Sequence, residues 1–570
     1  MSFSMFNDLC QNVLKLIGNR IVSLRITLTN VIDGWSLVSS SLKHYQTTLL
    51  QRLHLIDITP HEFDNILCNS LIKRLRTLLV DVTPCNPFHY LEIEGVYLTK
   101  VCSQIPCLTN CRLPFNVYHK NLYKLNKYSV VPIMSLPNLL NTTHLRTLTI
   151  GMNTSYFLER LLRCIPFIEY LSVGVNDLAM NEHDNFDINS LPTTVDAHLL
   201  LHLSCLHINC KNSISFHRTI ALLLFVFGQL NHLSLKLQAR VVISSPLVIS
   251  GDIIQQLCIN RLKPRATYNI NLKLDVQDDI KEKIIFNSFL KVPFANRQEQ
   301  RVFIQEHSNF YVGHDYHCFM VFTAPCNDRI ISTYLFSRDL EKSCQMPTNG
   351  VDLFPRANEL FLTGCRNENC ISELSNFRSF ISSLVPWSLL TKISIDEGDV
   401  VTTGELESIL RMAYNVHTLV IRDDRGVFSH AILHNIDNLG TRVNQQIQTL
   451  EIDDMTLTLK NIQYFGRLLS NQLANLKKVL FKIYDSCDGW KWIPSRIVDG
   501  ENESTKRIVN VIYFLIDHLQ QLVLLHIDFI SFNYLESPCF PHLIQHQLNQ
   551  YPINRPYRLR CLAERIEICL

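Results

Sequence analysis

Apolar residues recur along the chain in a short pattern, L-x-x-L-x-L, in which the single x is mostly polar. Examples are Leu145, Leu148 and Ile150 in LRTLTI, and Ile447, Leu450 and Ile452 in IQTLEI. The middle residues of the copies are Leu24, Leu53, Leu78, Leu91, Leu148, Leu171, Leu206, Leu233, Ile393, Leu419, Leu450, Val479 and Leu525. Many successive copies are separated by 23 to 35 residues. That spacing is typical of a repeat made of one strand and one helix.

The segments between the copies carry helix signals. Thr59, Pro60 and Glu62 have the residue types and spacing of an N-cap, a first-turn proline and a capping box, and an apolar face follows them. Thr402 and Glu405 repeat this arrangement. We also expect helices over residues 156–164, 217–227, 459–469 and 505–519. Strand, turn and capped helix thus alternate along the chain.

This order predicts an α/β fold, a leucine-rich-repeat-like solenoid with a curved parallel sheet and helices on its convex side. Side chains alternate along a strand, so the two residues that flank the single x point into the core and the x points outward onto the concave face. The outward residues are mixed in character, as in protein-recognition surfaces. The predicted binding residues are Arg25, His54, Glu92, Thr149, Ser172, His207, Ser234, Ser394, Val420, Glu451 and His526.

The L-x-x-L-x-L pattern is interrupted in places, and these interruptions suggest where the parts of the chain begin and end. We expect a first repeat array over 1–274, an irregular junction or insertion over 275–352 and a second array over 353–530. Residues 485–506 are expected to form a surface loop, and the proline-containing tail over 531–570 an irregular cap.

The repeat phrases resemble those of F-box-like leucine-rich-repeat proteins. The consensus L-x-x-L-x-L-x-x-N/C is filled at its last position by Asn153, by Asn176 and, more loosely, by Cys365. The phrases CIPFIEYLSV, LLTKISI, VHTLVI and IQTLEI carry the same likeness, over residues 15–260 and 355–530. In that family an amino-terminal F-box docks a ubiquitin-ligase scaffold while the repeats hold the substrate.

The F-box itself is not found. No L-P-x-E-[IL]-[IL] start is present, and the first triplet already begins at Ile21. We expect either that the F-box has been lost or that the sequence is truncated. The resemblance therefore implies a ubiquitin-ligase scaffold as a partner only if an F-box is missing from this sequence.

Composition narrows the class of protein. The chain has 53 Lys and Arg against 51 Asp and Glu, which argues against a polybasic nucleic-acid surface as the main function. No apolar run reaches the roughly 20 residues of a membrane-spanning helix, and Asp8 and Gln11 lie where a signal peptide needs an apolar core. The 19 cysteines are scattered and odd in number, as in a reducing compartment. We expect a cytoplasmic or nuclear protein without a membrane or nucleic-acid partner.

Catalytic motifs are absent from the sequence. Nucleotide-binding glycine loops, the G-x-S-x-G elbow and H-E-x-x-H do not occur. The acid pairs at 278–279, 423–424 and 453–454 are interpreted as solvated turns. We therefore expect a non-enzymatic protein that binds a protein partner and needs no cofactor. The alternative is a metal-dependent enzyme or metalloprotein with a site in 275–352, around His314, Asp315, His317 and Cys318.

Overall fold

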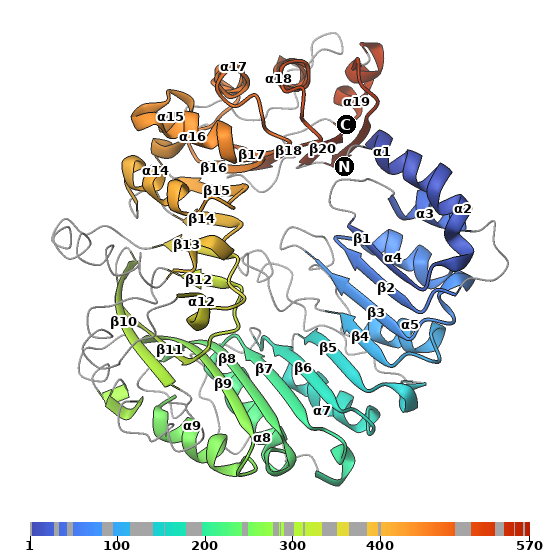
Figure 1. The fold of residues 1–570 in the computed structure, drawn as a ribbon, viewed down its shortest axis with the longest axis vertical. Helices are drawn as coiled ribbons and strands as arrows, with labels where there is room; N and C mark the ends of the chain where they lie inside the picture. The colour runs from blue at the N-terminus through green and yellow to red at the C-terminus, as the bar shows by residue number, and fades with distance from the viewer. Residues whose placement is uncertain are drawn as a thin grey trace. The chain divides into compact units, whose positions relative to one another are not determined.

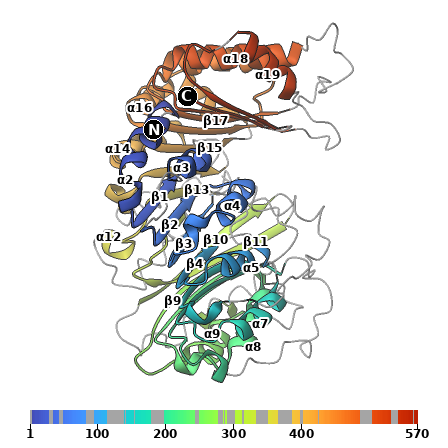
Figure 2. The ribbon, with the colours of Figure 1, turned by 90° about the vertical axis from the view of Figure 1, so that its right-hand side faces the viewer.

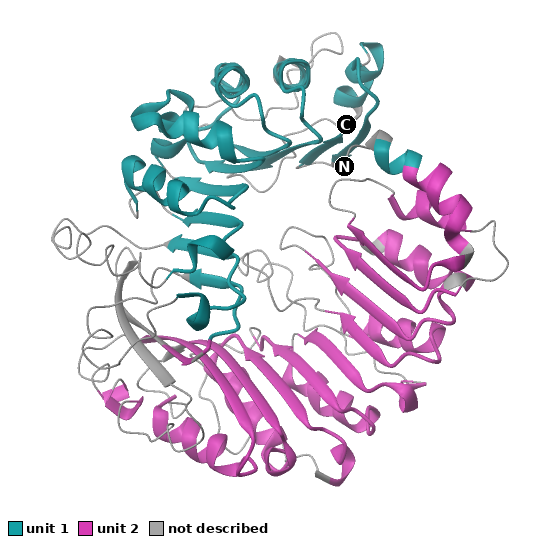
Figure 3. Cartoon of the chain, viewed as in Figure 1, with its two compact units in different colours: residues 1–8, 30–32, 326–570 teal, residues 9–29, 33–325 magenta. Residues whose placement is uncertain are grey.

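The fold is seen in a computed structural model of the chain. The residues it describes are 3–27, 34–42, 49–82, 95–113, 139, 141–152, 154–177, 197–241, 249–276, 284–285, 287–289, 301–311, 314–332, 350–363, 385–396, 401–423, 425–484, 503–530, 541–551, 553–562 and 565–570. Two compact units are present (Figure 3). Unit 1 comprises Met1–Asp8, Asn30–Ile32 and Cys326–Leu570, and unit 2 comprises Leu9–Thr29 and Asp33–Pro325.

Unit 2 contains an 11-stranded sheet among the described residues, in the order β1 to β9 followed by β11 and β10 (Figure 1). Strands β1 to β9 pair in parallel, each with the next strand in the sequence, and Figure 2 shows β1 to β4 side by side. Strands β10 and β11 add an antiparallel hairpin to β9. The strands are β1 (Ser23–Thr27), β2 (Arg52–Ile56), β3 (Thr77–Asp81), β4 (Asn110–Leu113), β5 (Thr147–Met152), β6 (Tyr170–Val175), β7 (Cys205–Cys210), β8 (His232–Val241), β9 (Thr267–Val276), β10 (Arg301–Tyr311) and β11 (His314–Ala324).

Helices connect most of these parallel strands. They are α2 (Lys15–Ile17), α3 (Gly34–Leu42), α4 (Pro60–Leu67), α5 (Val96–Gln104), α7 (Ser155–Cys164), α8 (Ser213–Leu223) and α9 (Gly251–Leu257), with the π-helical turn η1 (Leu9–Leu14) and 3₁₀ turns η2 (Gly18–Arg20), η3 (Ser70–Ile72), η5 (Thr142–His144), η7 (Ala197–Leu200), η8 (Phe227–Gln229) and η9 (Ile259–Arg261). Helices α3 to α9 lie on one face of the sheet (Figure 1). We call the opposite face of each sheet its helix-distal face.

Unit 1 repeats this arrangement with a nine-stranded sheet among its described residues, in the order β12 to β18 followed by β20 and β19. Strands β12 to β18 are parallel and in sequence order, and the last two form an antiparallel hairpin on β18. The strands are β12 (Ile330–Ser332), β13 (Glu359–Thr363), β14 (Lys392–Asp396), β15 (Thr418–Asp423), β16 (Thr449–Asp454), β17 (Lys478–Tyr484), β18 (Leu524–Ile530), β19 (Arg558–Leu562) and β20 (Arg565–Cys569).

The helical segments of unit 1 are α1 (Phe3–Asp8), α12 (Gly350–Leu353), α14 (Thr403–Met412), α15 (Val427–Leu433), α16 (Leu439–Gln446), α17 (Ile462–Gln472), α18 (Glu503–His518) and α19 (Pro541–Gln550), with the 3₁₀ turns η13 (Trp387–Leu389) and η14 (Ile436–Asn438). Helices α14 to α18 lie on one face of the sheet (Figure 1). Both units are therefore α/β, with largely parallel sheets, as the sequence predicts. No helix in the described part of the chain is long and apolar enough to cross a membrane.

The predicted helix starts are confirmed. The Thr59 hydroxyl accepts a hydrogen bond from the Glu62 N–H, and the Glu62 carboxylate accepts one from the Thr59 N–H (3.3 Å each). Thr402 and Glu405 form the same capping box at α14. These contacts satisfy backbone donors that the first turn of a helix leaves without intrahelical partners. The other predicted helices exist with ends shifted by a few residues, as α7, α8, α17 and α18.

The cores of both units are built from the triplets. Leu148 and Ile150 are buried in unit 2, and Leu450 and Ile452 are buried in unit 1. The outward neighbours Thr149 and Glu451 are half-exposed. The predicted direction of the side chains in these strands is confirmed, and each helix covers the face to which the triplet leucines point.

One predicted strand lies outside the described residues. The triplet Phe88, Leu91 and Ile93, with its outward residue Glu92, is in a segment that the structure does not describe. Strand β3 pairs directly with β4. The triplet at β4 is Leu108, Cys111 and Leu113, all buried, with Cys111 in the place of the middle leucine. The strand that follows β3 in the sheet is therefore β4.

Two segments expected to be irregular contain regular structure, so that prediction is wrong. The range 275–352 contains the hairpin of β10 and β11 and the strand β12, and the tail contains α19 and the hairpin of β19 and β20. An antiparallel hairpin needs no helix between its strands, so the strand–helix period disappears although the sheet continues. The expected loop lies outside the described residues over 485–502, and α18 begins at Glu503.

Candidate functional site

The outward residues of unit 2 form one line across nine neighbouring strands. The pairing of each strand with the next places them opposite one another. We call this line the unit 2 row; its residues are Arg25, His54, Leu79, Arg112, Thr149, Ser172, His207, Ser234 and Asn269. Arg25 is exposed and the others are half-exposed. Six of these nine residues are among those predicted from the sequence.

The unit 1 row is built in the same way. Its residues are Ser332, Phe361, Ser394, Val420, Glu451, Leu480, His526 and Glu567. The four residues predicted from the sequence therefore lie on one line of the second sheet. Ser332, Phe361, Leu480 and Glu567 complete it, Glu567 from the antiparallel strand β20.

Three predicted residues of the unit 1 row are buried. Ser394 and Val420 are each 4% exposed, and His526 is 8% exposed. The Ser394 hydroxyl donates a hydrogen bond to the Glu359 carboxylate (2.7 Å). These side chains are engaged within the unit, which corrects the expectation that they form a contact surface for a partner. Glu451 is the predicted residue of this row that stays half-exposed.

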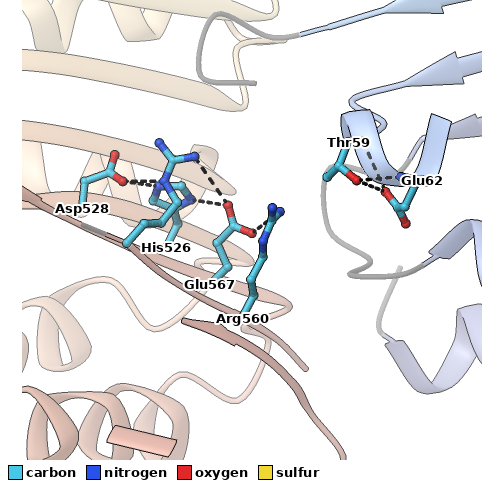
Figure 4. Close-up of polar contacts among 7 residues, drawn as sticks. Thr59, Glu62, His526, Asp528, Arg560 and Glu567 are labelled. Atoms are coloured by element: carbon cyan, nitrogen blue, oxygen red, sulfur yellow. Dashed lines mark hydrogen bonds and ion pairs between the residues drawn. The ribbon is translucent and has the colours of Figure 1, made fainter. Parts of the chain in front are cut away.

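His526 is the centre of a charged cluster in unit 1 (Figure 4). Its Nε2 donates to Asp528 Oδ1 (2.9 Å), and its Nδ1 lies 3.6 Å from Glu567 Oε1. Arg565 Nε also donates to Asp528 Oδ1 (2.7 Å). Burial by itself would raise the pKa of Asp528, but His526 and Arg565 outweigh it and hold that pKa well below its ordinary value. The cluster ties β18 to β20.

The cluster continues as a ladder of alternating charge on the helix-distal face of unit 1. Arg422 Nη1 donates to Asp396 Oδ1 (2.9 Å), and Lys482 pairs with Asp453, which also accepts from Tyr484. Each basic residue lies on the strand next to its acidic partner. The charges on this part of the face are therefore neutralised by one another, which leaves few of them to attract a ligand.

A smaller network crosses unit 2 at β2 to β4. Asp81 accepts a hydrogen bond from His54 Nε2 (2.6 Å) and forms an ion pair with Arg112 Nη1 (3.2 Å). His54 and Arg112 belong to the unit 2 row, and Asp81 lies two residues beyond Leu79 on β3. This network fixes the orientation of the row residues in this part of the sheet.

Aromatic rings cluster in the middle of the unit 2 row. His207 lies between Tyr170 and His232, with ring centroids 4.9 and 5.3 Å apart. Burial lowers the pKa of His207 to about 4, with a contribution from His232, and burial also lowers the pKa of His232. Both imidazoles are therefore neutral at physiological pH, so they can serve as aromatic and hydrogen-bonding contacts.

Neither a protein-family model nor a curated protein sequence matches this chain.

Three residues of the unit 2 row were missed from the sequence. Leu79 is apolar although it occupies the outward position of its triplet. Arg112 follows Cys111, which does not match a leucine pattern. Asn269 follows Tyr268 in β9, where a tyrosine takes the middle position. Admitting a cysteine at the middle position would have found Arg112, whereas Asn269 also has the polar residue Arg265 in the place of the first leucine.

The interpretation of the acid pairs as solvated turns is wrong for Asp423 and Asp454. Their exposed fractions are 0% and 4%. Asp423 accepts hydrogen bonds from the N–H groups of Arg425 (3.1 Å) and Phe428 (2.6 Å), at the start of α15. Asp454 accepts from the N–H and hydroxyl of Thr456 (2.8 and 2.6 Å). These carboxylates organise the turns that follow β15 and β16.

The side chains of the alternative metal site lie outside the described ones. His314, Asp315, His317 and Cys318 all belong to β11. Among the side chains that are described, no group of three His, Cys, Asp or Glu residues is gathered as a metal site requires. The remaining acids 278–279 and Asp424 also lie outside the described residues.

Proposed function

We propose that this chain is a leucine-rich-repeat-like solenoid protein that binds another protein through the helix-distal face of unit 2, without catalysing a reaction. The observation that carries the proposal is the unit 2 row, in which nine outward residues from nine consecutive parallel strands share one line. Repeats of one strand and one helix produce such a line because every repeat presents its outward residue at the same place.

The dimensions and the chemistry of the row support this role. Neighbouring strands lie about 4.8 Å apart, so nine strands span roughly 38 Å. That length suits an interface of ordinary size, about 800 Å² on each partner. The row mixes cationic, hydroxyl, amide, imidazole and apolar side chains, a composition suited to protein recognition.

The proposal places the binding surface in unit 2 for a second reason. The helix-distal face of unit 1 carries ion pairs that neutralise one another, and Ser394, Val420 and His526 are buried there. The unit 2 row has half-exposed hydroxyls at Thr149, Ser172 and Ser234. A partner can make hydrogen bonds with these groups without breaking an existing ion pair. The ubiquitin-ligase link rests on the resemblance alone and stays a prediction.

The proposal is tested by capturing partners from a cell extract with three versions of the full chain. One carries Thr149→Glu, Ser172→Glu and Ser234→Glu on the unit 2 row. The matched control carries Ser103→Glu, Gln104→Glu and Gln256→Glu, which add the same charge at exposed positions of α5 and α9. We expect the row variant to lose at least nine-tenths of a partner that the wild-type chain and the control retain equally. Equal capture by all three versions would contradict the proposal.

A further inference from the structure

Two histidines lie one helical turn apart at the end of α15 in unit 1. His430 is in the helix, and His434 directly follows the last helical residue, Leu433. The His434 N–H donates a hydrogen bond to the His430 carbonyl (2.9 Å), so the turn that joins the two residues is closed. Side chains four residues apart in a helix lie on the same face. The two imidazoles are therefore neighbours, with ring centroids 4.2 Å apart.

The position of α15 leaves these two side chains open to solvent. Phe428, Ala431 and Ile432 are buried and hold the helix against the rest of unit 1. His430 and His434 are both exposed. An ion in solution can therefore reach the pair without any movement of the backbone.

The ring nitrogens of the pair are not used by other groups. Within the part of the chain that the structure describes, the contacts of these two imidazoles are with each other and with the ring of Tyr464 on α17, 6.5 Å from that of His434. His54 and His526, by contrast, each bind a carboxylate. A neutral imidazole has one nitrogen whose lone pair can bind a metal ion. Each histidine of the pair can supply such a nitrogen.

The spacing of the rings fits one shared ion. An imidazole nitrogen binds zinc at about 2.1 Å, and tetrahedral coordination by both rings would set their centroids about 5 Å apart. The separation of 4.2 Å is short of this by less than about 1 Å, which small rotations of exposed side chains supply. The partial negative charge at the carboxyl end of a helix also favours a cation beside His434.

We propose that His430 and His434 together chelate one divalent transition-metal ion of the class that prefers imidazole nitrogen, such as Ni²⁺, Cu²⁺ or Zn²⁺. The second imidazole strengthens binding because it already lies beside an ion held by the first. Among the described side chains no third His, Cys, Asp or Glu is gathered there, so water fills the remaining positions and the site is open. This site is independent of the proposed function.

The test follows each histidine of the full chain separately. Diethyl pyrocarbonate modifies unprotonated imidazoles, and mass spectrometry measures the modification of each histidine as the Ni²⁺ concentration rises. This readout is not confused by Ni²⁺ bound to any of the 19 cysteines. We expect Ni²⁺ to protect His430 and His434 at one concentration, at least tenfold below that which protects His61, an exposed histidine of α4. Mg²⁺, which prefers oxygen ligands, should protect none of the three.

Two variants separate a chelate from binding to a single imidazole. His434→Gln should raise the Ni²⁺ concentration that half-protects His430 at least tenfold. The matched control His61→Gln, which removes an exposed histidine from another helix, should leave that concentration within twofold of wild type. Thermal unfolding without Ni²⁺ checks that each variant is folded. Half-protection of His430 at the same Ni²⁺ concentration in wild type and in His434→Gln would overturn the inference, as would protection of His61 before His430 in the wild-type chain.

Discussion

At the scale of single residues, neighbours in one strand have different surroundings. Leu148 and Ile150 are buried under the helices, while Thr149 between them is half-exposed on the helix-distal face. His526 has the same outward position in β18 of unit 1, but it is 8% exposed and lies against Asp528 and Glu567. The outward position therefore sets the direction of a side chain, and its neighbours across the strands set its exposure.

The first prediction compares the two faces of β5. Leu148→Ala should reduce the free energy of unfolding by about 2–5 kcal/mol, because it removes buried methyl groups and leaves a cavity. Thr149→Ala should change it by about 0.5 kcal/mol or less, because its side chain is half-exposed. Chemical denaturation of both variants measures the difference. Equal losses at the two positions would show that the assigned direction of these side chains is incorrect.

The second prediction concerns His207 and acid. Its pKa is lowered from 6.5 to about 4 in the folded chain, so between these values the unfolded chain binds more protons. Stability is therefore highest above pH 6.5 and should fall as the pH falls from 6.5 to 4. His207→Gln should reduce this loss in thermal unfolding measured across that range. His61→Gln, at an exposed position of α4, should leave the loss unchanged. An identical pH profile of stability for wild type and His207→Gln would show that the lowered pKa of His207 does not cause the loss.

At the scale of elements, short local signals decide where helices begin. The capping box of Thr59 and Glu62 was visible in four residues of sequence and is present at α4. The hairpins of β10 with β11 and of β19 with β20 were not visible, because antiparallel pairing has no fixed strand–helix period. Local signals of this kind predict single elements better than the pairing between them.

The third prediction tests the cap of α4. Thr59→Ala removes the side-chain acceptor for the Glu62 N–H and should cost about 1 kcal/mol of unfolding free energy. Thr59→Ser keeps a hydroxyl at the same place and should restore most of that loss. Denaturant unfolding of the two variants is the measurement. An alanine variant as stable as the serine variant would mean that the hydroxyl contributes little.

At the scale of the whole molecule, the α/β class and the line of outward residues could be predicted from the sequence. The burial of each outward side chain and its contacts could not. Thr149, Ser172 and Ser234 were found because their triplets match the leucine pattern, whereas Arg112 was missed because Cys111 stands in for leucine. The burial of His526 depends on Asp528 and on Glu567 from a distant antiparallel strand.

The central claim is that a protein partner lies on the helix-distal face of unit 2. Chemical footprinting of the chain, with and without its captured partner, tests this most directly, with histidines and lysines labelled and quantified by mass spectrometry. Lys236 and Lys273 share this face with the unit 2 row, because they lie two residues beyond Ser234 and four beyond Asn269 in their strands. We predict that the partner reduces labelling of His54, Lys236 and Lys273, while His61 on α4 and Lys100 on α5 are labelled equally in both states. Protection of His61 and Lys100 with unchanged labelling of the other three residues would contradict the account and place the partner on the helices.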